Sequence, residues 1–120
     1  MYSDLKPLHC GDDLALNSAT SVYKMVLPTG HREIVVRAIP TRVHTNVSST
    51  ALPILTLYNG STAVKATTAL AATAAVGVTK YDEIADGTEG MRFKAGDTLD
   101  LQVTTAADVS GNVQVILWID

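Results

Sequence analysis

The alternation of apolar and polar residues is unbroken in Asp97-Thr-Leu-Asp-Leu-Gln-Val-Thr-Thr105. Its two leucines and its valine share one face of an extended chain, because successive side chains of a strand point to opposite sides. A second alternating run follows in Asn112-Val-Gln-Val-Ile-Leu-Trp-Ile119. The connection at residues 106–111 contains the turn formers Asp, Ser and Gly. Together the two runs predict an antiparallel hairpin with one buried face.

The turn before this hairpin is also visible in the sequence. Lys94-Ala-Gly-Asp97 leads directly into the first alternating run. Gly96 can adopt a positive φ without steric cost, which allows the chain to turn sharply. We expect the side chain of Asp97 to accept hydrogen bonds from nearby backbone amides.

Further strands are predicted along the rest of the chain. Residues 33–39 are apolar on both faces, which is typical of a central strand. Pro40 interrupts this run because proline cannot donate to a β-ladder, and residues 41–46 are expected to continue it past a bulge. Residues 14–27 are expected to form a strand that ends in a turn.

A second hairpin is predicted where residues 53–58 meet Asn59-Gly60 and residues 61–65 pair back, since Asn-Gly is a strong hairpin signal. Residues 66–78 are rich in Ala and Thr, which leaves a long strand, a loop and a short helix open. The all-β context favours extended structure there. Residues 81–90 are acidic and contain two glycines, so we expect an exposed loop.

About seven or eight short strands separated by turn signals predict an all-β fold, an antiparallel β-sandwich of the jelly-roll type. Residues 1–13 show no sustained period. We therefore expect an N-terminal arm at 1–13, laid along the body or along a neighbour, and a single β-sandwich domain at 14–120. A chain of 120 residues is long enough for one domain with its own core.

The composition limits the possible partners. Apolar residues make up 47% of the chain and charged residues only 18%, against the ~25% usual in globular proteins. We therefore expect part of the surface to lie against a partner. The net charge of −3 argues against nucleic acid and against an anionic membrane surface as partners. With a single cysteine and no visible secretion signal, the chain is expected to be soluble and made in a reducing cytoplasm.

No metal centre is predicted from the histidines and the cysteine. His9, His31 and His44 lack the spacing of a metal site, and Cys10 beside His9 supplies too few ligands for zinc. The acidic stretch at 82–89 lacks the alternation of a calcium loop, so a solvated loop is the better interpretation.

No catalytic residue or cofactor is predicted either. Asp97, Asp100 and Asp108 lie near the last strands, and paired carboxylates can hydrolyse sugars. However, solvated carboxylates are ordinary on the polar face of a strand. The chain also lacks a phosphate loop, a dinucleotide fingerprint and a Gly-x-Ser-x-Gly motif.

The candidate functional residues are therefore contact residues. Trp118 and Ile116 are out of phase with the valines and leucine of the last run, so either both faces of that strand are covered or these two side chains meet a partner. The predicted N-terminal arm carries apolar groups without a sheet period, which favours an interaction element. The predicted interface consists of Tyr2, Leu5, Pro7, Leu8, Ile116 and Trp118.

Two stretches carry a family resemblance, namely Phe93-Lys-Ala-Gly-Asp-Thr-Leu-Asp-Leu-Gln-Val103 and Gly111-Asn-Val-Gln-Val-Ile-Leu-Trp-Ile119. They resemble the closing strands of the small capsid cement or decoration proteins of tailed bacteriophages. The resemblance implies a jelly-roll-like domain on the capsid surface of a virion. It also implies a homo-oligomer, with a trimer favoured, that binds the major capsid protein and stabilises the phage head.

The same part of the chain is also similar to trimeric jelly rolls of the tumour-necrosis-factor type and to carbohydrate-binding modules. A carbohydrate-binding module or virion adhesin is therefore the alternative function. The two functions differ in what they require of the aromatic side chains, because sugars stack on exposed rings. Clustering of Tyr23, Tyr58, Tyr81 and Trp118 on one open face would favour sugar binding.

Overall fold

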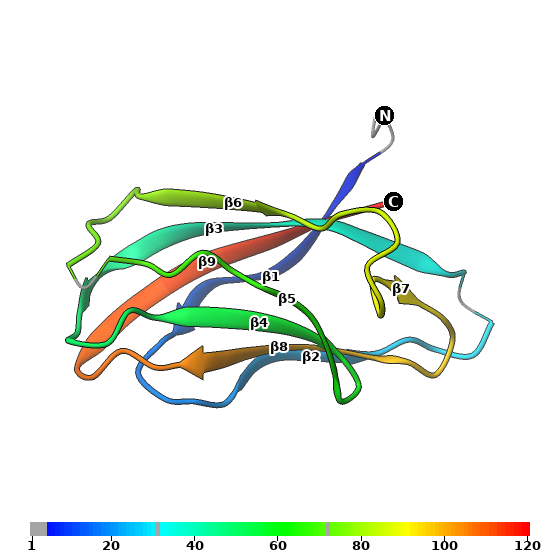
Figure 1. The fold of residues 1–120 in the computed structure, drawn as a ribbon, viewed down its shortest axis with the longest axis horizontal. Helices are drawn as coiled ribbons and strands as arrows, with labels where there is room; N and C mark the ends of the chain where they lie inside the picture. Colours follow the sequence, from blue (N-terminus) through cyan, green and yellow to red (C-terminus); the bar gives the residue numbers. More distant parts are fainter. Residues whose placement is uncertain (1–4, 31, 72) are drawn as a thin grey trace.

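The computed structural model describes residues 5–30, 32–71 and 73–120, and shows a sandwich of two antiparallel β-sheets (Figure 1). Within those residues there are strands and turns but no helix, and hence no helix that could cross a membrane. The strands of the described chain are β1 (Lys6–Ala15), β2 (Ser21–Val26), β3 (Ile34–Ser48), β4 (Ile54–Asn59), β5 (Thr62–Ala66), β6 (Thr79–Glu83), β7 (Arg92–Phe93), β8 (Thr98–Thr105) and β9 (Ser110–Ile119).

The strand order is that of a jelly roll. One sheet has the order β1-β9-β3-β6, with the short β7 also paired to β3, and the other has the order β2-β8-β4-β5. Leaving β7 aside, two four-stranded sheets result, and most consecutive strands lie in opposite sheets, as in a double-sheet jelly roll. The predicted all-β antiparallel sandwich is therefore confirmed, with one or two strands more than expected.

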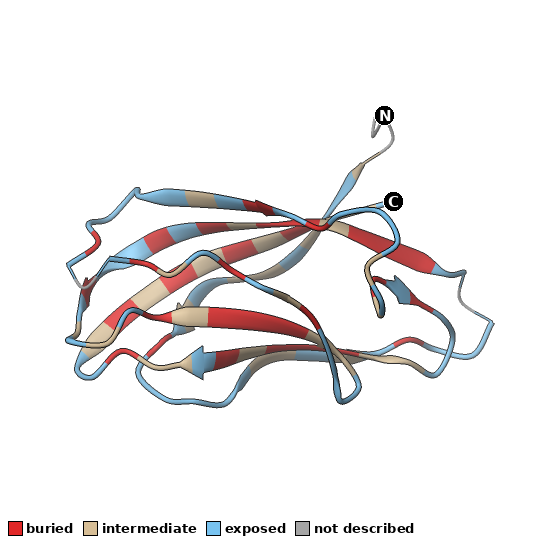
Figure 2. Ribbon diagram, viewed as in Figure 1, coloured by how far each residue is buried: buried red, intermediate tan, exposed pale blue. Residues whose placement is uncertain are grey.

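The inner faces of the two sheets form the core, and the sequence alternation identifies them correctly. Leu99, Leu101 and Val103 of β8 are buried, as are the alternating residues Val113, Val115 and Leu117 of β9. Figure 2 shows the resulting alternation of buried and half-buried positions along β9.

The predicted hairpin between these two runs is wrong, because β8 and β9 lie in opposite sheets. β8 pairs with β2 and β4, whereas β9 pairs with β1 and β3. The connection at 106–109 crosses the edge of the sandwich, and its Ala107 is 2% exposed and donates its amide to the Leu16 carbonyl at 2.8 Å. Alternation shows which face is buried, but the partner strand depends on distant residues.

The N-terminal region contains a strand that its sequence hides. In β1, Pro7 pairs with Trp118 and Leu8 with Leu117, so the expected division between an arm at 1–13 and a domain at 14–120 falls inside this strand. The register shifts after His9 and again after Gly11. Each shift breaks the period of two, which is why no sheet pattern is visible in the sequence.

β3 runs through Pro40 without interruption, and Pro40 pairs with Tyr81 of β6. The bulge expected near Pro40 lies earlier on the β9 side, between Val36 and Ala38. The hairpin of β4 and β5 is confirmed. Its loop is Gly60-Ser61, one residue later than expected, and Gly60 has a φ of +62°.

Residues 67–71 and 73–78 are irregular, and these described residues form neither the long strand nor the helix that were considered. They connect the two sheets along one side, and Leu70 and Ala74 are buried in the core. The acidic stretch 81–90 is only partly an exposed loop, which corrects the prediction. Its first residues belong to β6, where Asp82 is buried and accepts hydrogen bonds from the Thr68 amide (3.0 Å) and hydroxyl (2.6 Å).

Candidate interaction surface

The outer face of the five-stranded sheet carries a group of apolar side chains. Antiparallel partners point to the same side of a sheet, so Pro7 lies beside Trp118, and Pro40 lies beside Tyr81. Ile116 is two residues from Trp118 and shares its face. The outer patch, as we name this group, consists of Pro7, Pro40, Tyr81, Ile116 and Trp118.

The other sheet packs on the opposite side, so none of its strands covers the outer patch. Tyr81 is 54% exposed, and Ile116 and Trp118 are half-buried. Leu70 and Ala74, from the segment between β5 and β6, are buried in the core rather than placed over this face.

The structure brings some of the predicted interface residues together and separates others. Pro7, Ile116 and Trp118 share the outer patch, although Pro7 is far from the other two in the sequence. Leu8 points to the other side of β1 and packs against the core. Leu5 lies just before β1 and is half-buried, and Tyr2 is outside the described residues.

Pro40 and Tyr81 are members of the outer patch that sequence reasoning missed. Pro40 was expected to interrupt its strand, and Tyr81 was assigned to a loop. The signal for Tyr81 lies in the alternation of Thr79, Tyr81 and Glu83 with Lys80 and Asp82, which is short and carries charges on both faces.

Two shallow hollows lie on this side of the molecule. The larger, of about 360 Å³, is lined by Asp12, Arg42, Val43, His44, Val76 and Gln114. The smaller, of about 150 Å³, is lined by Pro40, Thr41, Arg42, Thr79, Gln114 and Ile116. Arg42 and Gln114 line both hollows. These two polar residues therefore lie directly beside the apolar residues of the outer patch.

The polar residues around the outer patch include one small network. They also include two charged residues that lack an ion-pair partner among the residues that the structure describes. Asp12 accepts a hydrogen bond from Gln114 Nε2 at 2.7 Å, and its carboxylate lies 2.9 Å from His9 Nε2. Arg42 and Glu83 form no ion pair with any residue that the structure describes. Aromatic and apolar groups ringed by polar residues that include arginine are typical of protein interfaces.

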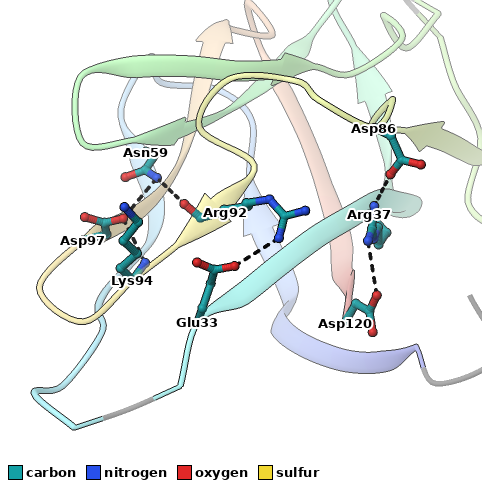
Figure 3. Close-up of polar contacts among 8 residues, drawn as sticks. All are labelled: Glu33, Arg37, Asn59, Asp86, Arg92, Lys94, Asp97 and Asp120. Atoms are coloured by element: carbon teal, nitrogen blue, oxygen red, sulfur yellow. Dashed lines mark hydrogen bonds and ion pairs between the residues drawn. The ribbon is translucent and has the colours of Figure 1, made fainter.

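Two carboxylates of the acidic stretch, Asp82 and Asp86, are engaged in separate structural contacts. Arg37 pairs with Asp86 and, at 3.3 Å, with Asp120, which ties the loop after β6 to the end of the chain (Figure 3). Arg92 pairs with Glu33 at 3.0 Å. Over residues 5–30, 32–71 and 73–120, no group of three metal-ligating side chains comes together.

The three carboxylates considered for sugar hydrolysis are also held apart. Asp97 accepts the Lys94 amide at 2.9 Å, as expected for a residue that closes the turn at Gly96, whose φ is +88°. Asp100 is buried and accepts a hydrogen bond from the side-chain amide (Nε2) of Gln102 at 2.8 Å. Hydrogen bonds from Thr50 lower the pKa of Asp108.

Cys10 is unsuited to nucleophilic chemistry. Burial raises the pKa of its thiol from 9.0 to about 12, so the reactive thiolate is scarce at neutral pH. The thiol contacts the Leu8 carbonyl oxygen at 3.8 Å and lies against the core.

No family model and no curated protein matches the sequence. One solved structure is similar, a chain of the structure of infectious bursal disease virus, Gx strain. The match has a TM-score of 0.50 at 12% identity and covers 96% of this chain but only 31% of the viral one. At this identity the similarity concerns the fold alone: the β-sandwich of this chain resembles a part of that viral chain.

Proposed function

We propose that the chain is a non-enzymatic structural protein of a virus particle. The single observation that carries the proposal is the jelly-roll sandwich, which over 96% of this chain matches 31% of a chain from a virus structure. Jelly rolls are recurrent in viral capsids and in lectins. The open, apolar outer patch supports a role in contacts with other proteins.

The more specific proposal is a capsid cement or decoration protein of a tailed bacteriophage. In this role the chain sits on the capsid surface, binds the major capsid protein and itself, and stabilises the phage head. This part rests on the resemblance of residues 93–103 and 111–119 to such proteins. Many symmetric contacts on one shell would make a weak individual contact effective. The trimeric state is likewise taken from the resemblance.

Quantitative mass spectrometry of purified virus particles tests the role. We expect the chain at a copy number comparable with that of the shell protein. Heated particles that lack the chain should release their genome at a lower temperature, and adding the purified chain should restore the original temperature. Absence of the chain from purified particles would refute the virion role, whereas its presence without any effect on particle stability would refute only the cement role.

Sugar binding is the second candidate, and one observation favours it. Tyr81 and Trp118 both project from the open face of the five-stranded sheet. Tyr58 belongs to the other sheet, and Tyr23 lies beside the core and contacts the Met25 sulfur at 3.6 Å. Two of the four candidate aromatic residues therefore share this open face, and the other two do not.

A glycan array with the wild-type chain and a Tyr81→Ala variant tests the second candidate. Specific binding that the substitution abolishes would support a sugar-binding face, because stacking on an exposed ring supplies much of such an affinity. No binding across the array would leave the structural role as the better account of the patch.

A further inference from the structure

We propose that the outer patch binds the outer patch of a second copy of this chain, face to face about a two-fold axis. The proposal goes beyond the virion role and does not depend on it, and its two-fold dimer takes the place of the trimer that the family resemblance implies. It rests on the apolar centre of the patch, on the two charges at its ends and on the features of the edge strands that discourage edge-to-edge pairing.

The centre of the patch has the composition of an interface core. Pro40 and Tyr81 are paired neighbours on β3 and β6, and Ile116 lies on β9 at the other side of Pro40, where both line the smaller hollow. Tyrosine and tryptophan dominate the binding energy of many interfaces. Tyr81, at 54% exposure, has the most to gain from being covered.

Arg42 and Glu83 lie at opposite ends of this centre. Arg42 pairs with Thr79, and Glu83 pairs with Ala38, while the Pro40–Tyr81 pair lies midway between them. Arg42 and Ala38 are four residues apart on β3, which corresponds to about 13 Å along the strand. The patch thus has a cation at one end and an anion at the other, and both charges are without an ion-pair partner in the described part of the chain.

A two-fold axis through the Pro40–Tyr81 pair, in the plane of the face and perpendicular to the strands, uses both charges. It reverses the strand direction, so Arg42 of each copy lies over the Ala38–Glu83 pair of the other. The same operation places the two Tyr81 side chains together. A self-complementary surface of this kind is what an isologous contact requires.

The sheet edges favour a face contact over pairing of edge strands. β1 is an edge strand with two register shifts, and Asp12 and Asp13 are exposed in its shifted part. β5 and β6, at other edges, have five residues each. Bulges, charges and short strands are the features that discourage edge-to-edge association. A second copy therefore finds its apolar contact on the face.

Sedimentation equilibrium with two charge-reversal variants, Arg42→Glu and Glu83→Arg, tests this contact. Wild type should form a dimer at micromolar concentration, and each variant alone should self-associate at least tenfold more weakly, because like charges then face each other. Mixing the two variants should restore dimers, since each opposite-charge pair is regenerated across the axis. The double variant Arg42→Glu/Glu83→Arg should also dimerise alone.

Lys94→Glu is the matched control, because it reverses an exposed charge in the turn before β8 and should leave the dimer intact. A monomeric wild type would overturn the proposal. A wild-type trimer would overturn the two-fold contact while agreeing with the state that the family resemblance implies. Failure of the mixed variants to dimerise would show that Arg42 and Glu83 do not meet across the axis. None of these outcomes decides whether the chain is found in virus particles, so the two proposals fail separately.

Discussion

Leu101 lies at the centre of the core and contributes to stability through burial alone. It is 0% exposed on the inner face of β8, between Tyr23 of β2 and Leu57 of β4 in the register of the sheet. Leu101→Ala should lower the free energy of unfolding by roughly 2–5 kcal/mol, from lost burial and the cavity that remains. Urea denaturation followed by Trp118 fluorescence measures the change.

Val109→Ala is the control for Leu101→Ala, because Val109 is 66% exposed in the connection between β8 and β9. Its loss should change the free energy of unfolding by less than about 0.5 kcal/mol, as for most surface substitutions. A Leu101→Ala variant as stable as Val109→Ala would mean that the inner and outer faces of β8 are exchanged.

The Cys10 thiol makes stability depend on pH at the alkaline end. Its pKa is about 12 in the folded chain, against the ordinary value of 9.0, because burial disfavours the thiolate. The folded state therefore holds the proton more tightly, and stability falls as the pH rises from 9 towards 12. The slope attributable to one such group is at most about 1.4 kcal/mol per pH unit.

Melting temperatures of wild type and Cys10→Ala between pH 7 and pH 11 isolate this effect. Burial also raises the pKa of Tyr23, with the same sign, so the difference between the two proteins is the relevant quantity. Cys10→Ala should lose less stability above pH 9 than wild type does. Parallel curves would show that the Cys10 thiolate is already solvated in the folded protein.

At the scale of elements, the pairing of β1 with β9 determines the expected effect of an N-terminal truncation on stability. Deleting residues 1–11 removes the part of β1 that pairs with the last residues of β9, including Leu8 against the core. We expect the free energy of unfolding to fall by more than about 2 kcal/mol, from lost burial and unpaired backbone groups. Deleting an arm that contributes to assembly alone would leave the free energy of unfolding unchanged.

Deleting residues 1–5 is the control, because it leaves all of β1 in place. Thermal melts of both truncations and the full chain measure the difference. Equal melting temperatures for the full chain and the 1–11 deletion would show that the pairing of β1 with β9 adds no stability, and the N-terminal region would then act only in contacts with partners.

At the scale of the whole molecule, the fold should be independent of metal ions. Among the described residues, no three histidine, cysteine or carboxylate side chains come together as a ligand set. A chelator should leave the melting temperature unchanged, because only a ligand bound by the native state raises stability. A downward shift of more than a few degrees that added calcium or zinc reverses would contradict this expectation.

The sequence by itself determined the local features of this protein. The alternation in 98–105 and 110–119 identified the buried faces of β8 and β9, and Gly60 and Gly96 marked turns that the structure contains. These features depend on neighbours in the chain, because a strand has a period of two and a turn needs a particular backbone angle. Short-range patterns are therefore sufficient to predict them.

Tertiary structure alone decided which strands are neighbours and which side chains form the outer patch. β9 pairs with β1 and β3 rather than with β8, and β1 follows no visible period because bulges shift its register. Pro7, Tyr81 and Trp118 meet on one face only because β1, β9, β3 and β6 are arranged side by side. A strand can bury its apolar face against many partners, and the choice among them is made by the packing of the whole sandwich.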